Sequence, residues 1–300
     1  MAALSPMMQQ YFEHQKTASR QDIVFRLGDF YEMFYDDAIL ASKELELTLT
    51  GRDCGQEERA PMCGVPFHSY ENYVARLIAK GYKVAICEQM EDPALAKGLV
   101  KRDIIRVVTP GTVIESSMLQ DDKNNYIASI YITEKKAGVC FADVSTGTAH
   151  ATVLTGEKLG PEIISELCRY SPSEVLFNAA ILDYKEVTAY IKQQLACSVE
   201  LLDEAAFAPD ACMEEMRAQF GDAPEKTAGL APESPAFTAL AVLLGILKGN
   251  TEKGRGAVKD RTQLRRSAVY AAFARHARQP GADGNDARAR EKRYAAVGAG

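Results

Sequence analysis

The sequence predicts an α/β protein, and three observations support that fold class. Segments rich in β-branched and aromatic residues alternate with amphipathic segments of helical spacing through most of the chain. The composition, 47% hydrophobic and 25% charged, is typical of a globular protein. No apolar run approaches the roughly 18–20 residues that a membrane-spanning helix needs. The 300 residues leave room for two ordinary domains.

The first expected domain, residues 1–115, mixes helix and strand signals and predicts an α+β unit. Ser5 followed by Pro6 is typical of a helix start, because serine caps the first turn and proline fits its first position. Gly28-Asp29 predicts a break after a strand, and residues 51–61 a polar loop. We expect helices over residues 6–16, 35–45 and 69–79, and strands over 23–27, 47–49, 82–87 and 103–109.

The second expected domain, residues 125–248, begins with sequential strands and continues with alternating helices and strands. This order predicts an α/β layer with a mixed sheet. We expect strands over residues 125–133, 137–147, 148–154 and 174–177, and helices over 161–169, 183–194 and 236–248. The last helix is apolar on most sides, so its partner surface should be large. Residues 116–124 are the expected linker.

The composition changes at about residue 249. Beyond it Ile and Met are absent, Leu occurs once, and Ala and Arg dominate. Large apolar residues fall below the level at which a packed core forms, so we expect an irregular or poorly folded segment over residues 249–300.

Charge and cysteine content restrict the function classes. The net charge is −6, with the positive excess concentrated after residue 250, so the acidic body argues against nonspecific coating of DNA. Seven cysteines without a CxxC pair predict reduced thiols, and four scattered histidines predict no metal site. The N-terminus lacks the pattern of a signal peptide. We expect a cytoplasmic protein without a membrane partner.

The most informative string is residues 26–34, RLGDFYEMF. In an extended segment Phe30 and Glu32 point to one face, because side chains alternate with a period of two. A phenyl ring that stacks beside a carboxylate that accepts hydrogen bonds suits a nucleobase. The alternative is a buried Phe30 with a surface Glu32 at a strand end.

Several basic or polar residues are weaker candidates for contacts to a DNA backbone. Arg52 follows an expected strand, His68 and Ser69 precede a helix, and a dense basic run includes Arg106. The alternatives are a solvated loop arginine, helix capping and a solvated strand edge. The candidate set is Arg52, His68, Ser69, Lys97, Lys101 and Arg102.

Asp143 in the string DVSTG leaves a different function open. An Asp on a strand followed by Ser and Gly also occurs in metal-dependent nucleases. Such an enzyme needs further carboxylates, and Asp183 and Glu186 have no recognisable spacing relative to Asp143. A protein-interaction module without DNA binding is the other alternative.

Four blocks of the chain resemble one known family. Residues 26–38, 60–93, 101–112 and 142–147 are similar, in collinear order, to the N-terminal part of the MutS family of bacterial DNA mismatch repair proteins. The resemblance covers residues 1–248. It implies a mismatch-recognition domain in which Phe30 wedges beside a mispaired base and Glu32 hydrogen-bonds that base. The second domain would be a connector with an RNase H-like fold.

The resemblance also implies partners and cofactors. The intact family protein is a homodimeric, DNA-dependent ATPase that uses ATP and Mg²⁺, binds mismatched double-stranded DNA and works with a MutL-type repair protein near the nucleoid. This chain contains no G-x-x-x-x-G-K-[ST] motif, so we expect no cofactor in it and leave its own catalysis uncertain. The chain would be a fragment with the recognition and connector domains.

A reading-frame hypothesis accounts for the unusual final segment. Codons for residues 249–253, 268–272, 279–287 and 293–299 can be chosen so that the frame one base later encodes ETQKK, QFMRL, NLELTETMR and GTLLWVL. These strings are family-like and occur in order. We therefore interpret residues 249–300 as an out-of-frame tail, against the alternative of a natural Ala/Arg-rich segment.

Overall fold

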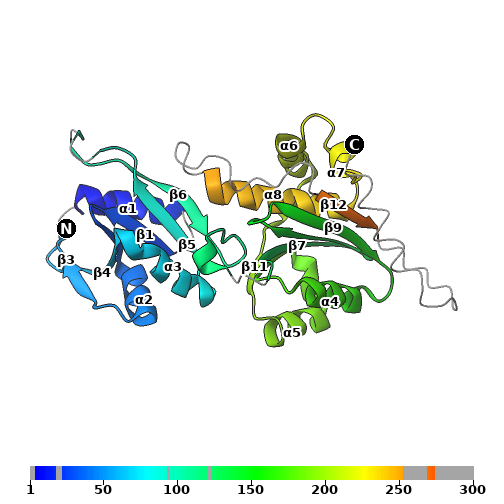
Figure 1. Ribbon diagram of the computed structural model, residues 1–300, viewed down its shortest axis with the longest axis horizontal. Helices are drawn as coiled ribbons and strands as arrows, with labels where there is room; N and C mark the ends of the chain where they lie inside the picture. The colour runs from blue at the N-terminus through cyan, green and yellow to red at the C-terminus, as the bar shows by residue number, and fades with distance from the viewer. Residues whose placement is uncertain are drawn as a thin grey trace.

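The computed structural model describes residues 4–17, 22–92, 95–96, 98–119, 123–252 and 269–273. Within these residues the strands form two six-stranded sheets, one in each half of the chain. The halves form two lobes, blue to cyan and green to orange in Figure 1. Helices pack on both sheets, which confirms the predicted α/β class.

The first lobe is a mixed sheet in the order β3-β4-β2-β1-β5-β6. Neighbouring strands are antiparallel, apart from the parallel pair β1–β5. Its strands are β1 Asp22–Leu27, β2 Phe30–Phe34, β3 Thr50–Arg52, β4 Ala60–Pro66, β5 Val84–Gln89 and β6 Arg102–Val108. Its helices are α1 Pro6–Thr17, α2 Tyr35–Leu45, α3 Tyr70–Ala79 and the 3₁₀ turns η1 Phe67–Ser69 and η2 Ser116–Met118.

The expected strand over residues 47–49 is wrong. Helix α2 ends at Leu45, and its C-cap residue Glu46 is in the left-handed conformation. Leu47 donates its amide to the Ser42 carbonyl, so the chain is still leaving the helix there. The strand begins at Thr50 instead, where β3 pairs with β4. Strand β4 had no counterpart among the expected elements, because Pro and Gly interrupt its apolar pattern.

The second lobe is a sheet in the order β11-β10-β7-β8-β9-β12. Strands β7, β8 and β9 are antiparallel neighbours, and β10 and β11 add in parallel on the other side of β7. Its strands are β7 Tyr126–Thr133, β8 Lys136–Asp143, β9 Thr148–Thr155, β10 Glu174–Phe177, β11 Ser198–Leu201 and β12 Val269–Phe273. Its helices are α4 Leu159–Tyr170, α5 Lys185–Gln193, α6 Pro209–Phe220, α7 Pro224–Ala228, α8 Pro235–Glu252 and the 3₁₀ turns η3 Ala179–Asp183 and η4 Glu204–Phe207.

The position of helix α8 accounts for its apolar sequence. It crosses one face of the second sheet, with α4 and α5 on the other face (Figure 1). Residues of α6, among them Met216 and Phe220, cover it from a further side. The predicted large partner surface is therefore present, and α6 and β11 are elements that sequence patterns did not predict.

Regular structure extends past the expected boundary at residue 248. Helix α8 continues beyond it to Glu252, and β12, which lies wholly after it, pairs in parallel with β9. The rest of the predicted out-of-frame tail lies outside the described residues, so that hypothesis stays a prediction. In the part of the chain that the structure describes, no helix combines the length and apolarity required to cross a bilayer.

Candidate nucleic-acid interface

Phe30 lies at the tip of the β1–β2 hairpin. Leu27 pairs with Phe30, so Gly28 and Asp29 form the two-residue turn. Gly28 has φ +63°, the conformation that a type II′ hairpin turn requires at its first central position. The Phe30 side chain is 48% exposed, whereas the adjacent Tyr31 is buried. The phenyl ring is therefore available to stack on a flat partner, and the alternative of a buried Phe30 is wrong.

Glu32 lies on the same face of β2 as Phe30, as the two-residue spacing predicts. Its side chain is only 14% exposed and forms an ion pair with Arg52 on β3. Gly64 on β4 stands opposite Glu32, and a Cβ there would come within 3.3 Å of the Glu32 Cγ. Burial raises the pKa of the Glu32 carboxyl above its usual value, although Arg52 and Arg102 act in the opposite direction.

A Glu32→Gln variant should be more stable than the parent chain at neutral pH. Because the folded-state pKa of Glu32 is above the reference value of 4.5, charging the carboxyl costs more in the folded state, and stability falls as pH rises through that range. The difference in Tm should vanish in acid, where Glu32 is protonated in both states. Thermal unfolding in acid and at neutral pH measures this difference in Tm. The control is Glu71→Gln, since Glu71 lies on the exposed surface of α3. A neutral-pH loss of stability in Glu32→Gln would contradict it.

Arg102 has a different environment from the one expected of a backbone contact. Its side chain is buried, with 6% of the residue exposed. The guanidinium donates to the carbonyls of Arg26 and Val100 at 2.8 and 2.9 Å and to Gln10 Oε1 at 3.2 Å. It also lies over the Phe25 ring. Arg102 therefore joins α1, β1 and β6, and this placement does not favour a phosphate contact.

The other members of the basic run are placed unequally. Lys101 is exposed, and its backbone amide donates to Glu91 Oε1 at 2.7 Å. Arg106 forms an ion pair with Glu115. Lys97 lies outside the described residues. Lys101 is thus the member whose side chain is exposed within the described part of the run.

His68 and Ser69 belong to the 3₁₀ turn η1 that leads into α3. His68 is exposed, whereas Ser69 is partly buried. The Ser69 hydroxyl donates to the Pro66 carbonyl at 3.3 Å and makes no capping hydrogen bond to α3. Ser69 therefore occupies the N-cap position of α3 without a side-chain cap, and the exposed imidazole of His68 is the group that a phosphate could reach.

Two residues beside Phe30 were missing from the sequence-based candidates. Arg26 on β1 stacks on the Phe67 ring and reaches the carbonyl of Gly28 in the turn before Phe30. Their sequence signal is weak, because an arginine on a strand and an aromatic after a proline occur in many proteins. Only the pairing of β1, β2 and β4 brings them to the hairpin tip.

Asp143 in the second lobe supports a turn. Its Oδ1 accepts hydrogen bonds from the Ser145 amide and hydroxyl at 2.9 and 2.6 Å and from the Thr146 amide at 3.2 Å. Within the described ranges, no group of three His, Cys, Asp or Glu side chains is placed to hold a metal ion. The hydrogen bonds of Oδ1 are those of a residue that holds a turn.

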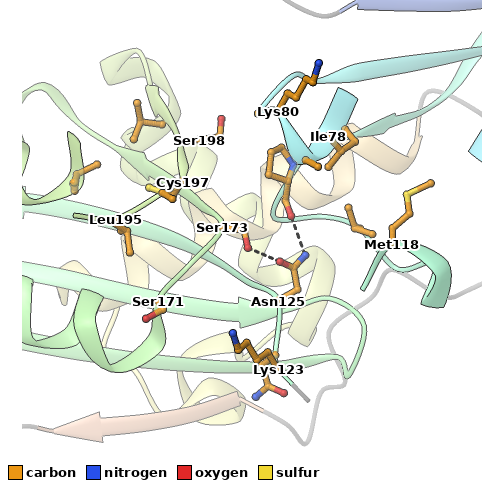
Figure 2. A pocket seen from close by; sticks show the side chains of 18 of the residues that line it. Ile78, Lys80, Met118, Lys123, Asn125, Ser171, Ser173, Leu195, Cys197 and Ser198 are labelled. Carbon is orange, nitrogen blue, oxygen red and sulfur yellow. Dashed lines mark hydrogen bonds between the residues drawn. The ribbon is translucent and has the colours of Figure 1, made fainter. Parts of the chain in front are cut away.

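The two lobes meet at a buried carboxylate that sequence patterns also missed. Glu174 at the start of β10 pairs with Lys83 at 2.8 Å and accepts hydrogen bonds from the Thr109 hydroxyl and the Gly111 amide. Beside this junction lies a cavity of about 1170 Å³. Figure 2 shows that Asn125, which lines the cavity, accepts a hydrogen bond from the Ser173 hydroxyl. Charge and hydrogen bonds thus connect the lobes.

Known protein families match both lobes. A model of MutS domain I matches residues 5–117, and a model of MutS domain II matches residues 125–253. The first match ends at residue 117, and the second begins at residue 125.

Individual relatives agree with the family models. The chain is 50% identical over 222 residues to the DNA mismatch repair protein MutS of Acetivibrio thermocellus, which covers 74% of this chain and 26% of the relative. It is 52% identical over 207 residues to the protein of that name from Ruminiclostridium cellulolyticum, and that match covers 69% of this chain and 24% of the relative. It is 41% identical over 256 residues to the DNA mismatch repair protein MutS of Alkaliphilus oremlandii, and that match covers 84% of this chain and 29% of the relative. The chain spans about a quarter of the length of these relatives. With both lobes matched in order, the chain belongs to the MutS family and contains its domains I and II.

Proposed function

We propose that this chain recognises mispaired or unpaired bases in duplex DNA as part of DNA mismatch repair. Phe30 acts as a stacking wedge and Glu32 as the contact to the displaced base. The observation that carries the proposal is the pair itself. An exposed phenyl ring stands at a hairpin tip, and a largely buried carboxylate lies two residues along the same face.

The physics of wedge insertion favours a mispaired target. Insertion of a ring between base pairs costs a few kcal/mol of unstacking, which stacking on the aromatic ring offsets. A mispaired step unstacks and kinks at lower cost than a paired one. Specificity therefore arises from deformability of the duplex, with little need for a code of base-edge contacts.

The environment of Glu32 suits a contact inside a polyanion. An ionised carboxylate is repelled by phosphates, and burial raises the pKa of the Glu32 carboxyl, so protonation beside DNA costs less than for a fully exposed carboxyl. Either a protonated Glu32 or a Glu32 that accepts from a base N–H avoids this repulsion. Arg52, which pairs with Glu32 and has a side chain 38% exposed, is a candidate for a contact to the DNA backbone. His68 and Lys101 are exposed candidates for further phosphates.

The properties of the whole family protein are further proposals for this chain. They include ATP- and Mg²⁺-dependent action, homodimer formation, a MutL-type partner and a cytoplasmic, nucleoid-associated location. The supporting observation is the membership in the MutS family. Domain II, with its α/β sheet, would connect the reading domain to such partners.

Replacement of Phe30 by Ala should abolish the preference for mispaired over paired duplex. Because stacking on an aromatic contributes about 1–3 kcal/mol per base, binding to the mispaired duplex should weaken by about 5- to 150-fold. Fluorescence anisotropy with two duplexes that differ by one mispair measures the preference. Ile39→Ala, which removes another exposed apolar side chain of the same domain, is the matched control.

Two outcomes would reject the proposal. An equal preference in the parent chain and in Phe30→Ala would show that the ring is not the wedge. The absence of any DNA binding, together with capture of a protein partner that is indifferent to Phe30→Ala, would favour the interaction module instead. The test is specific only when Ile39→Ala binds DNA as the parent chain does and keeps the preference for the mispaired duplex.

A further inference from the structure

The turn that presents Phe30 is held by groups outside its own backbone. The carbonyl of Gly28 accepts a hydrogen bond from Arg26 Nε at 3.2 Å. The carbonyl of Asp29 accepts one from the Phe67 amide at 2.8 Å. Both central residues of the turn are therefore fixed through their carbonyls, in addition to the hydrogen bonds of the β1–β2 ladder.

The Arg26 guanidinium is itself held from several directions. Its Cζ lies 3.5 Å from the centroid of the Phe67 ring, and its Nη1 lies 2.9 Å from Glu88 Oε2 on β5. Glu88 is anchored in turn, because the Tyr31 hydroxyl donates to its Oε1 at 2.6 Å. The side chains of Arg26 and Glu88 are 21% and 20% exposed. The guanidinium is thus ordered before any ligand arrives.

These contacts use features that only arginine provides. The planar guanidinium presents its face to the Phe67 ring while separate N–H groups reach a carbonyl and a carboxylate. A lysine ammonium at this position would keep the positive charge. It would lose the planar stacking and the simultaneous, directed hydrogen bonds.

We infer that Arg26 is a positioning residue for Phe30: its guanidinium, stacked on Phe67 and anchored by Glu88, holds the turn from which the phenyl ring is presented. The inference rests on the proposed function, in which that ring enters a duplex. A wedge on a preordered tip loses less conformational freedom on insertion than a wedge on a mobile one, so the clamp strengthens recognition without touching DNA.

The competing role for Arg26 is a simple charge contact to a phosphate. Two variants separate the roles. Arg26→Lys keeps the charge and removes the clamp, and Glu88→Gln weakens the anchor of the guanidinium, by removing the charge of the acceptor, without changing Arg26. Arg76→Lys is the matched control, since Arg76 on α3 also donates to a backbone carbonyl, that of Leu45, at 3.2 Å.

Amide hydrogen exchange in the free chain tests the clamp without DNA. The Phe67 amide, which donates to Asp29, should exchange about tenfold faster in Arg26→Lys and in Glu88→Gln, and at the parent rate in Arg76→Lys. Tm should stay close to that of the parent in all three. Unchanged exchange in both clamp variants overturns the inference, because the guanidinium then does not hold the turn.

The binding preference tests the consequence for recognition. With duplexes that differ by one mispair, Arg26→Lys and Glu88→Gln should each lower the preference by about three- to tenfold and leave binding to paired DNA and its salt dependence unchanged. A full preference in Arg26→Lys overturns the positioning role, as does an equal loss on both duplexes with an altered salt dependence. If the parent chain shows no preference, the proposed function fails, and the exchange rates still decide whether Arg26 holds the turn.

Discussion

A Gly138→Ala substitution is expected to destabilise the second domain severely. Gly138 lies in β8, and a Cβ there would sit 1.9 Å from the Pro235 carbonyl oxygen and 2.4 Å from the Ala236 nitrogen. These are backbone atoms of α8, so no side-chain rotation relieves the clash. Overpacking commonly costs about 1–3 kcal/mol, and a clash with helix backbone lies at or above the upper end.

The cost arises because α8 is the main cover of this sheet face. Its residues Phe237, Leu240 and Leu243 are buried against the sheet and α6, and a shift of the first turn opens that contact. We expect a Tm lower by about 6–12 °C, measured by thermal unfolding followed by circular dichroism. A parent-like Tm would mean that α8 does not lie against Gly138.

Gly245→Ala provides a control with the opposite sign. Gly245 lies within α8, and a Cβ there would meet the Glu215 Cγ at 3.4 Å, an ordinary contact. Alanine in a helix interior is favoured over glycine by up to about 1 kcal/mol. Its Tm should therefore equal or exceed that of the parent, and a similar loss in both variants would indicate a general intolerance of α8 to change.

The fold was predictable where local signals agreed with tertiary packing. The helix predicted over residues 35–45 coincides with α2, and the short strand predicted over residues 174–177 coincides with β10. Strand β4 was not predictable in the same way, because its Pro and Gly are tolerated only through pairing with β2 and β3. Helix α6 has a weak apolar pattern, and its cover by α8 decides its conformation.

The candidate site was predictable only in part. The spacing of Phe30 and Glu32 indicates a shared face, and the structure confirms that face. The partner of Glu32 depends on the edge strand β3, and the burial of Arg102 depends on acceptors from α1 and β1. The role of Arg26 becomes interpretable only when the structure places Phe67 of the 3₁₀ turn η1 and Glu88 of β5 beside it. Long-range pairing, which periodicity does not encode, supplies these neighbours.

Removal of the Glu174 carboxylate should produce the other large loss of stability. Glu174 is 1% exposed and receives Lys83, the Thr109 hydroxyl and the Gly111 amide from the first lobe. Glu174→Ala leaves these donors buried without that acceptor, and loss of one partner of a buried pair costs about 3–5 kcal/mol. Urea unfolding should show a correspondingly lower midpoint. Glu44→Gln, which breaks the exposed Lys80–Glu44 pair, should leave the midpoint unchanged.

The pH dependence of the loss identifies its electrostatic part. Burial by itself lowers the pKa of Lys83, but Glu174 and Glu200 outweigh it and leave the pKa above the reference value of 10.5. The ion pair therefore stabilises the fold fully below that value and loses its effect as pH rises through the folded-state pKa. Glu174→Gln keeps an acceptor for Thr109 and Gly111 but weakens the hold on Lys83. The loss of stability in Glu174→Gln should be smaller than that in Glu174→Ala and should shrink in strong alkali. A loss that does not change with pH would instead assign the stability of the junction to packing around Gly111, where a Cβ would lie 2.7 Å from the Ile127 Cβ.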